Sequence, residues 1–245
     1  MESKYTRDFQ VACFFADHRR IMRPAAFLDL AQHMATNAAD VLSFGDEQLS
    51  ALNCAWVLAR MKVEFHKPVH FNDVIKMETW HRGMNGLYFI RDFKLFDNSG
   101  DLCVTSTSSW IVMNIETRSI ARDSALNTVI PAKGQCDDFA IEVPAGKVVM
   151  PRNCEPEVLG SHKVVYSDLD FNMHVNNVKY TVWALDMLPE ELVFNKMLKE
   201  LTINFNKEVH MGETVDFYHK ETDGAHIVEG RVGNTQVFII KLIFE

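Results

Sequence analysis

A ten-residue repeat is the feature of this sequence that most restricts its fold. The segment MKVEFHKPVH, residues 61–70, aligns with LTINFNKEVH, residues 201–210, at a constant offset of 140 residues. The identical positions are Phe65/Phe205, Lys67/Lys207, Val69/Val209 and His70/His210. A repeat at this distance is typical of a duplicated module, so we expect two tandem copies of one fold.

Both copies have the same predicted order of elements, a helix followed by a run of strands. In the first copy, helical spacing predicts a helix from Pro24 to about residue 43, with apolar positions Phe27, Leu30, Met34, Ala38 and Val41. Strands are expected at residues 9–15, 55–66, 74–82, 87–96 and 102–114. The second copy predicts a helix at 175–188 and strands at 162–167, 198–208, 214–220, 226–232 and 236–244. This order predicts an α+β fold in which each module is a long helix wrapped by an antiparallel β-sheet.

Residues 118–160, between the two copies, have the composition of a linker. Four of the seven prolines lie in this stretch, and it has no sustained period: Pro131, Pro144, Pro151 and Pro156. We therefore expect an N-terminal module over residues 1–117, a linker over 118–160 and a C-terminal module over 161–245.

Composition and charge argue against several classes of function. A net charge of −8 and a pI near 5.7 give no electrostatic support for binding nucleic acid. No apolar run is long enough to span a membrane, and the first residues do not resemble a secretory signal. The five cysteines are scattered and the ten histidines lack paired ligand spacing. We therefore expect a cytoplasmic protein with reduced thiols, no metal site and no cofactor.

The segment YSDLDFNMHVNNVKY, residues 166–180, concentrates polar side chains immediately before the second helix. It contains two carboxylates, three amides and one imidazole: Asp168, Asp170, Asn172, Asn176, Asn177 and His174. The N-terminus of a helix has free N–H groups that can hold an anion. These residues can form either a capping cluster or the reactive part of an active site.

The first copy lacks most of these groups. When Asp17 is aligned with Asp168, the opposing pairs are Arg19/Asp170, Ile21/Asn172 and Arg23/His174, and the repeat adds Pro68/Glu208. A simple helix cap would be expected in both copies, so the asymmetry favours one active site in the second half.

The segment from Ser167 to Tyr180 resembles, almost residue for residue, the SDLDxNxHVNNxKY motif of the acyl-acyl carrier protein thioesterases of plants and bacteria. Residues 56–61, 86–92 and 107–114 are similar to blocks of that family in the same order, so the resemblance covers nearly the whole chain. It implies a double hotdog fold and the hydrolysis of fatty acyl thioesters carried by acyl carrier protein, which releases free fatty acid and ends chain elongation.

The resemblance also implies the residues of the site. The family's catalytic set maps onto Asp170, Asn172, His174 and Glu208. Val175, Asn176 and Asn177 are the corresponding candidates for substrate binding, and the first half is implied to help form the acyl-chain tunnel. Plant members have a cysteine after the glutamate, once proposed as a nucleophile, where this chain has Val209. The reaction is therefore expected to use water and not an acyl-enzyme.

Thioester hydrolysis needs an activated water and stabilisation of an oxyanion. The departing thiol, with a pKa of roughly 8.5, needs little help from a general acid. We expect Glu208 or Asp170 to be the general base, with His174 relaying the proton and Asn172 positioning water or a carboxylate. The backbone N–H groups of His174 and Val175 are the candidates for holding the oxyanion.

Three other functions were considered for this chain. An enoyl-thioester hydratase is disfavoured, because such enzymes carry an Asp-x-Asn-Pro segment and Met173 stands in the proline position here. Acyl-CoA hydrolysis uses the same chemistry and stays an alternative, as does a non-catalytic acyl-thioester sensor, although no DNA-binding segment precedes Phe9. The basic residues Arg19, Arg20 and Arg23 could meet the acidic carrier protein that we expect as partner. The sequence leaves open whether two chains form a homodimer.

Overall fold

The structure is a computed structural model that describes residues 4–121, 135–151 and 155–245. The chain divides into two compact units, residues 1–145 (unit 1) and residues 146–245 (unit 2). Each unit combines helices with one antiparallel run of strands, which confirms the predicted α+β class.

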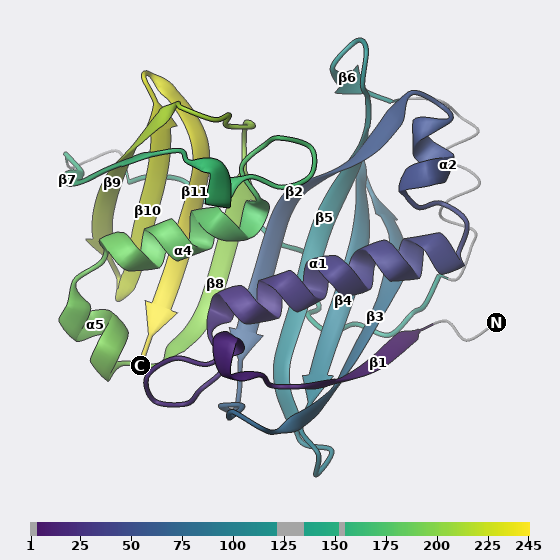
Figure 1. Ribbon diagram of the computed structural model, residues 1–245, viewed down its shortest axis with the longest axis horizontal. Helices are drawn as coiled ribbons and strands as arrows, with labels where there is room; N and C mark the ends of the chain where they lie inside the picture. The colour runs from purple at the N-terminus through teal and green to yellow at the C-terminus, as the bar shows by residue number, and fades with distance from the viewer. Residues whose placement is uncertain (1–3, 122–134, 152–154) are drawn as a thin grey trace. The chain divides into compact units, whose positions relative to one another are not determined.

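In unit 1 a long helix, α1 (Pro24–Val41), lies across the face of an antiparallel sheet (Figure 1). Neighbouring strands follow the order β1 (Tyr5–Gln10), β3 (Val74–Asn85), β4 (Tyr88–Phe96), β5 (Leu102–Asn114) and β2 (Cys54–Phe65). The short elements are a 3-10 turn (Cys13–Phe15), α2 (Asp46–Ser50) and β6 (Ser119–Ile120), which pairs with β5.

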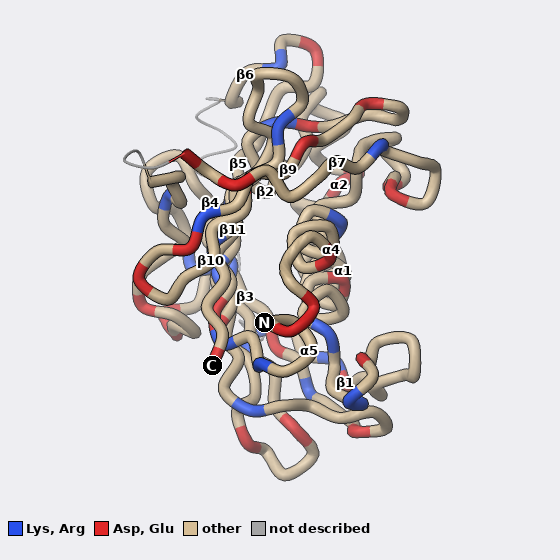
Figure 2. The backbone as a smooth tube through the Cα atoms, turned by 90° about the vertical axis from the view of Figure 1, so that its left-hand side faces the viewer, with Lys and Arg blue, Asp and Glu red and all other residues tan. Residues whose placement is uncertain are grey.

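Unit 2 repeats this arrangement. Its strands follow the order β7 (Glu157–Lys163), β9 (Thr214–Thr222), β10 (Ala225–Val232), β11 (Thr235–Phe244) and β8 (Leu198–Phe205). The helix α4 (Asn177–Met187) lies on one side of strands β9, β10 and β11 in the edge-on view of Figure 2. A 3-10 turn (Tyr166–Asp168) precedes α4, and α5 (Glu190–Asn195) follows it. Because the strand order of unit 1 recurs element by element, the duplication predicted from the repeat is confirmed.

Apolar spacing explains why each helix binds its sheet. In α1 four of the predicted apolar positions, Phe27, Leu30, Met34 and Ala38, are buried, whereas Val41, the last residue of the helix, is 63% exposed. Phe27 packs edge-on against Phe65 of β2. In α4 the rings of Tyr180 and Trp183 contact each other and reach Phe238 and Phe217, respectively, on the sheet. Burying one such large side chain stabilises a fold by about 1.5–3 kcal/mol.

A glycine in β10 makes room for the ring of Phe238 on the neighbouring strand β11. A Cβ atom at Gly230 would lie 2.2 Å from a ring carbon of Phe238, which is a steric clash. The register of β10 against β11 also shifts between Gly230 and Arg231. Glycine is therefore required here for packing.

Some predicted elements are displaced or were missed. The first strand occupies Tyr5–Gln10 and not residues 9–15, which include a 3-10 turn with Phe14 exposed. As an edge strand β1 tolerates exposed polar residues, so its sequence lacks the apolar signal. Strand β7 begins at Glu157, earlier than the predicted residue 162, and α4 begins at Asn177, later than the predicted 175. The short helices α2 and α5 carry too few turns for a periodic signal.

The described parts of the predicted linker are tied to the units by side chains. In unit 1, Arg82 donates to the carbonyls of Ile141 and Glu142, and the buried Asp92 accepts from the N–H of Ala140. In unit 2, Asn204 accepts from the N–H of Val148 and donates to the carbonyl of Gly146. Residues 122–134 and 152–154 of the predicted linker lie outside the described residues. Among the helices that the structure describes, none has the length and apolar character needed to cross a membrane.

Candidate active site

The loop before α4 is shaped by Asp170. Its Oδ1 atom accepts the N–H groups of Asn172 at 2.8 Å and His174 at 3.3 Å, while its own N–H donates to the carbonyl of His174 at 2.8 Å. Met173, between them, has a positive φ of 64°, which is uncommon for a residue with a side chain. The carboxylate of Asp170 therefore closes a tight turn and fixes the position of the His174 backbone.

Two backbone contacts attach this turn to the segment that follows β8. His174 forms an isolated antiparallel bridge with His210, and the N–H of Val175 donates to the carbonyl of Val209 at 2.9 Å. Val209 is fully buried and anchors the segment, so its neighbours Glu208 and His210 are held beside the turn. The two halves of the site, far apart in sequence, are thus joined by main-chain contacts.

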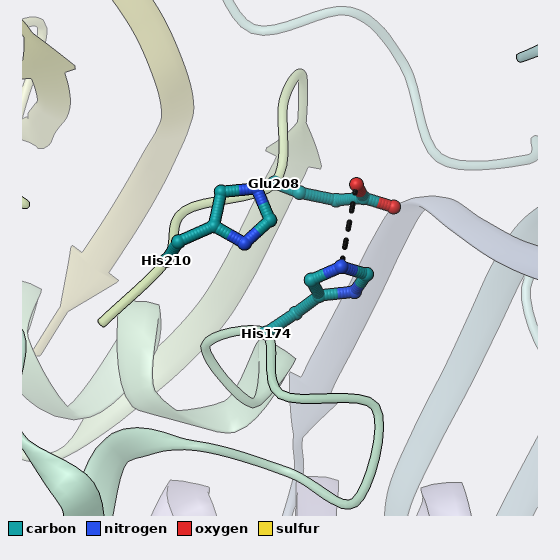
Figure 3. A group of neighbouring side chains, drawn as sticks. All are labelled: His174, Glu208 and His210. Atoms are coloured by element: carbon teal, nitrogen blue, oxygen red, sulfur yellow. Dashed lines mark ion pairs between the residues drawn. The ribbon is translucent and has the colours of Figure 1, made fainter.

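The result is a pair of groups suited to proton transfer. The Nε2 atom of His174 lies 3.6 Å from Oε2 of Glu208, and each side chain is 29% exposed. Figure 3 shows both Glu208 and His210 directed toward the ring of His174. The rings of His174 and His210 meet edge-on, with centroids 5.0 Å apart. A half-buried carboxylate beside an imidazole that is open to water is an arrangement that can activate water.

His210 is a neighbour of the site that the sequence analysis noted only as an identical position of the repeat. Glu208 and His210 flank a buried valine, and residues two apart in extended chain point to the same side. The Glu-x-His spacing therefore could have indicated from the sequence that His210 lies beside Glu208.

The remaining predicted residues have separate positions. Asn172 lies exposed in the turn, and within the described part of the chain its side-chain amide makes no hydrogen bond. The side chain of Val175 is buried. Asn176 is the N-cap of α4, and its Oδ1 accepts the N–H of Val178 at 2.9 Å. Asn177, partly exposed, begins the helix.

Asp168 has a structural environment. Its Oδ2 accepts from Nε2 of His162 at 2.8 Å and from the N–H of Val165 at 2.9 Å. Burial would raise the pKa of Asp168, but these hydrogen bonds outweigh it and leave that pKa below its usual value. Asp168 therefore remains an ionised anchor of the loop, as expected for a capping or turn residue.

Tyr180, on α4, is excluded as a base. Burial raises the pKa of its hydroxyl, and the nearby charges of Glu208 and Glu213 raise it further. The hydroxyl stays protonated at neutral pH.

The structure corrects the expected oxyanion donors. The N–H of His174 is directed to Asp170 and that of Val175 to Val209, so both are already engaged. The N–H of Asn177, at the first position of α4, has no acceptor among the described residues. It replaces them as a candidate donor.

The structure also corrects the alignment of the two copies near this loop. In unit 1, Oδ1 of Asp17 accepts the N–H groups of Arg19 and Ile21, just as Asp170 does in unit 2. Ile21 bridges His70 as His174 bridges His210. Asp17 therefore corresponds to Asp170, an offset of 153 residues, whereas the sequence alignment placed it on Asp168 at an offset of 151.

Family models match both units of the chain. The model described as the acyl-ACP thioesterase N-terminal domain, where ACP is acyl carrier protein, matches residues 2–124, half of the chain. The acyl-ACP thioesterase C-terminal domain matches residues 154–237. The chain belongs to the acyl-ACP thioesterase family. Asp170, Asn172, His174 and Glu208 all fall within the second matched domain.

Solved structures of this family share the fold along the whole chain. An acyl-ACP thioesterase from Bacteroides thetaiotaomicron is 24% identical, with a TM-score of 0.89 over 99% of this chain and 98% of that one. The 12:0-ACP thioesterase from Umbellularia californica is 19% identical, with a TM-score of 0.88 over 100% of this chain and 98% of that one. The two modules are therefore tandem hotdog modules, as the sequence resemblance implied.

Among curated relatives, oleoyl-acyl carrier protein thioesterase 2 of Arabidopsis thaliana, a chloroplastic protein, is 30% identical over 204 residues. The match covers 77% of this chain and 55% of that relative. A second chloroplastic oleoyl-acyl carrier protein thioesterase of the same plant is 26% identical over 86% of this chain and 62% of its own length. The chain thus spans a little more than half the length of these relatives.

Proposed function

We propose that this protein hydrolyses fatty acyl thioesters of acyl carrier protein with activated water, releasing free fatty acid. The observation that carries the proposal is the contact between His174 and Glu208, 3.6 Å apart on a turn fixed by Asp170, within the matched C-terminal domain. The names of the relatives, oleoyl- and palmitoyl-acyl carrier protein thioesterases, support this substrate class.

Glu208 is the general base in this proposal. The Oδ1 atom of Asp170 is occupied by two N–H groups of the turn, and Asp17 makes the same contacts in unit 1. Glu208 instead faces an imidazole and has no acidic counterpart, since unit 1 has Pro68 there. A water beside the pair attacks the thioester carbonyl and loses its proton to Glu208, directly or through His174. Collapse of the tetrahedral intermediate expels the thiolate.

A covalent acyl-enzyme is not needed for this chemistry. Val209, which follows the base, is buried and has no nucleophilic atom. The four described cysteines, Cys13, Cys54, Cys103 and Cys136, carry free thiols and belong to unit 1.

The substrate contacts proposed for this site lie at the start of α4. The N–H and amide of Asn177 are available to the carbonyl oxygen or to the substrate's amide arm. Asn176 and Val175 support this position through the helix cap and the core, and Asn172 can orient water. The first module, over residues 1–117, is proposed to bind the acyl chain, and residues 161–245 to supply catalysis.

Carrier and location complete the proposal. Acyl carrier protein is the proposed partner and the cytoplasm the proposed compartment, while the plant relatives are chloroplastic. Pairing of two chains is a separate question, which the mass of the protein in solution decides.

The test is release of free thiol from matched acyl carrier protein and CoA thioesters, with wild type beside Glu208→Gln. Turnover on the carrier-protein thioesters that falls at least about 10²-fold in the variant supports the proposal. Equal turnover on CoA thioesters would keep the chemistry and reassign the carrier. Binding of acyl thioesters without turnover would overturn the enzymatic proposal in favour of a sensor.

A further inference from the structure

Three potential metal ligands, one of them the proposed base Glu208, converge at the site. One atom each of His174, Glu208 and His210 lies within 4.8 Å of the other two (Figure 3). Two imidazoles and one carboxylate are a ligand set that Zn²⁺ accepts in proteins, with one position left for water. We propose that these three residues form a Zn²⁺-binding site whose occupation inhibits the enzyme.

The geometry needs little adjustment to bind the ion. Around a tetrahedral Zn²⁺ with bonds of about 2.1 Å, two ligand atoms stand roughly 3.4 Å apart. His174 and Glu208 are already at 3.6 Å. A side-chain rotation that brings His210 closer by about an ångström closes the set, and His210 is exposed and can move.

The backbone holds the three residues in place before any ion arrives. The bridge between His174 and His210 fixes their Cα atoms opposite each other, and the N–H of His210 donates to Glu213 at 2.6 Å. A site whose ligands are held in advance loses less conformational entropy on binding. All three ligands belong to unit 2, so the site is complete within one module.

Inhibition follows from which atoms the ion would take. Coordination uses the lone pair of His174 and the carboxylate oxygen of Glu208, the same atoms that the proposed mechanism needs to remove a proton from water. This inhibitory part rests on the proposed function, whereas the binding part does not. His210 has no role in the proposed chemistry, so binding and catalysis can be separated through it.

Unit 1 supplies a matched control. His70 is the repeat equivalent of His210, but its bridge partner is Ile21 and the position equivalent to Glu208 is Pro68. His70 therefore has neither of the other two ligands beside it.

The experiment compares wild type, His210→Gln and His70→Gln as untagged, chelator-treated proteins. Titration with ZnCl₂ in a calorimeter is expected to show one site in wild type and in His70→Gln, weakened at least about tenfold in His210→Gln because one of three protein ligands is lost. Mg²⁺, added as MgCl₂, is expected to bind to none of the three proteins, since imidazole is a poor ligand for this ion.

Hydrolysis is then measured in parallel. Without metal the three proteins should agree within about twofold. Zn²⁺ should inhibit wild type and His70→Gln at the concentrations at which it binds, and His210→Gln only at about tenfold higher concentrations. Equal Zn²⁺ affinity in wild type and His210→Gln would overturn the site, and bound Zn²⁺ with undiminished hydrolysis would overturn the inhibition. If no protein hydrolyses thioesters, the proposed function fails while the calorimetry still decides the site.

Discussion

The turn at residues 17–22 of unit 1 and the turn at residues 170–175 of unit 2 have the same backbone and different chemistry. Each is closed by an aspartate that accepts two N–H groups, and each attaches to the segment after the first long strand of its unit by a bridge to a histidine. The residue at the bridge is Ile21 in unit 1 and His174 in unit 2. The comparison teaches that the turn is a shared scaffold and that the second copy places an imidazole on it where the first has an aliphatic side chain.

Asp17 and Asp170 differ in their side-chain partners beyond the turn. Asp17 also pairs with Arg19, which donates to its Oδ2. Burial would raise the pKa of Asp17, but the N–H of Ile21 and the guanidinium of Arg19 outweigh it and lower that pKa. In unit 2 the residue equivalent to Arg19 is Asn172, so Asp170 lacks this guanidinium. The scaffold therefore tolerates either a cationic or a neutral polar side chain at this position.

The largest expected effect comes from making unit 2 resemble unit 1 at the bridge. His174→Ile keeps the backbone contacts, because unit 1 forms them with isoleucine, but it removes the imidazole. We expect kcat/KM for thioester hydrolysis to fall by about 10²–10⁴-fold, the range typical of a lost acid–base group. Circular dichroism should report an unchanged fold. Activity within tenfold of wild type would exclude His174 from the chemistry.

A smaller and more selective effect is expected at Asp170. Asp170→Asn retains Oδ1 as an acceptor for both N–H groups, whereas Asp170→Ala removes it. If Asp170 acts by holding the turn, kcat/KM should fall by about 10²-fold in the alanine variant and stay within about tenfold of wild type in the asparagine variant. Asp17→Ala, the matched change in unit 1, should leave kcat/KM unchanged. An asparagine variant as inactive as Glu208→Gln would make Asp170 a candidate base again.

The loop anchor Asp168 should contribute to the free energy of unfolding in a way that depends on pH. Unit 1 has no equivalent carboxylate, because Phe15 occupies the corresponding position. Its folded pKa is lowered, so its carboxylate stabilises the fold above the unfolded pKa and loses this contribution as pH falls through the folded value. Relative to Asp168→Asn, wild type should gain about 1.5–3 kcal/mol at neutral pH from charged hydrogen bonds. Urea unfolding at pH 7 and below about pH 4 checks this; an equal difference at both would contradict it.

The smallest expected effect lies at the helix starts. Asn176 caps α4 with its side chain, whereas Arg23 at the N-cap of α1 makes no such bond and α1 begins with Pro24. Asn176→Ala should lower the free energy of unfolding by about 1 kcal/mol. Arg23→Ala should cause no loss through capping. The guanidinium of Arg23 donates to the carbonyl of Phe14, so any shift in Arg23→Ala reports that bond and not a cap. Thermal unfolding of Asn176→Ala measures the cap, and an unchanged midpoint would mean that the cap adds nothing.

Much of the fold could be predicted because its signals are local. The spacing of Phe27, Leu30 and Met34, the proline at the start of α1 and the turn at Gly233-Asn234 depend on neighbours in sequence. The duplication was visible because Phe65, at the end of β2, and Lys67, Val69 and His70, which follow it, recur at the same spacing in the second copy. The prediction failed for the edge strand β1 and for the short helices α2 and α5. An edge strand pairs on one side only, and a short helix has few turns, so neither leaves a clear periodic pattern in the sequence.

The alignment of the two turns failed for a different reason. Matching Asp17 to Asp168 joins like residues, but structural equivalence is set by the hydrogen bonds that each aspartate makes, and these pair Asp17 with Asp170. The true partner of Asp168 is Phe15, which shares no chemistry with it. One identical residue is too little to fix a register that backbone contacts decide.

By itself, the sequence determined that this protein has two α+β modules, that reactive side chains are concentrated in the second, and which family it resembles. Only the tertiary structure decided that Glu208 and His210 stand at His174, that Oδ1 of Asp170 accepts two N–H groups of the turn, and that the N–H groups of His174 and Val175 are not free. The physical reason is that residue types and their spacing follow from the chain, whereas a contact between residues 174 and 208 exists only once the bridge to His210 has formed.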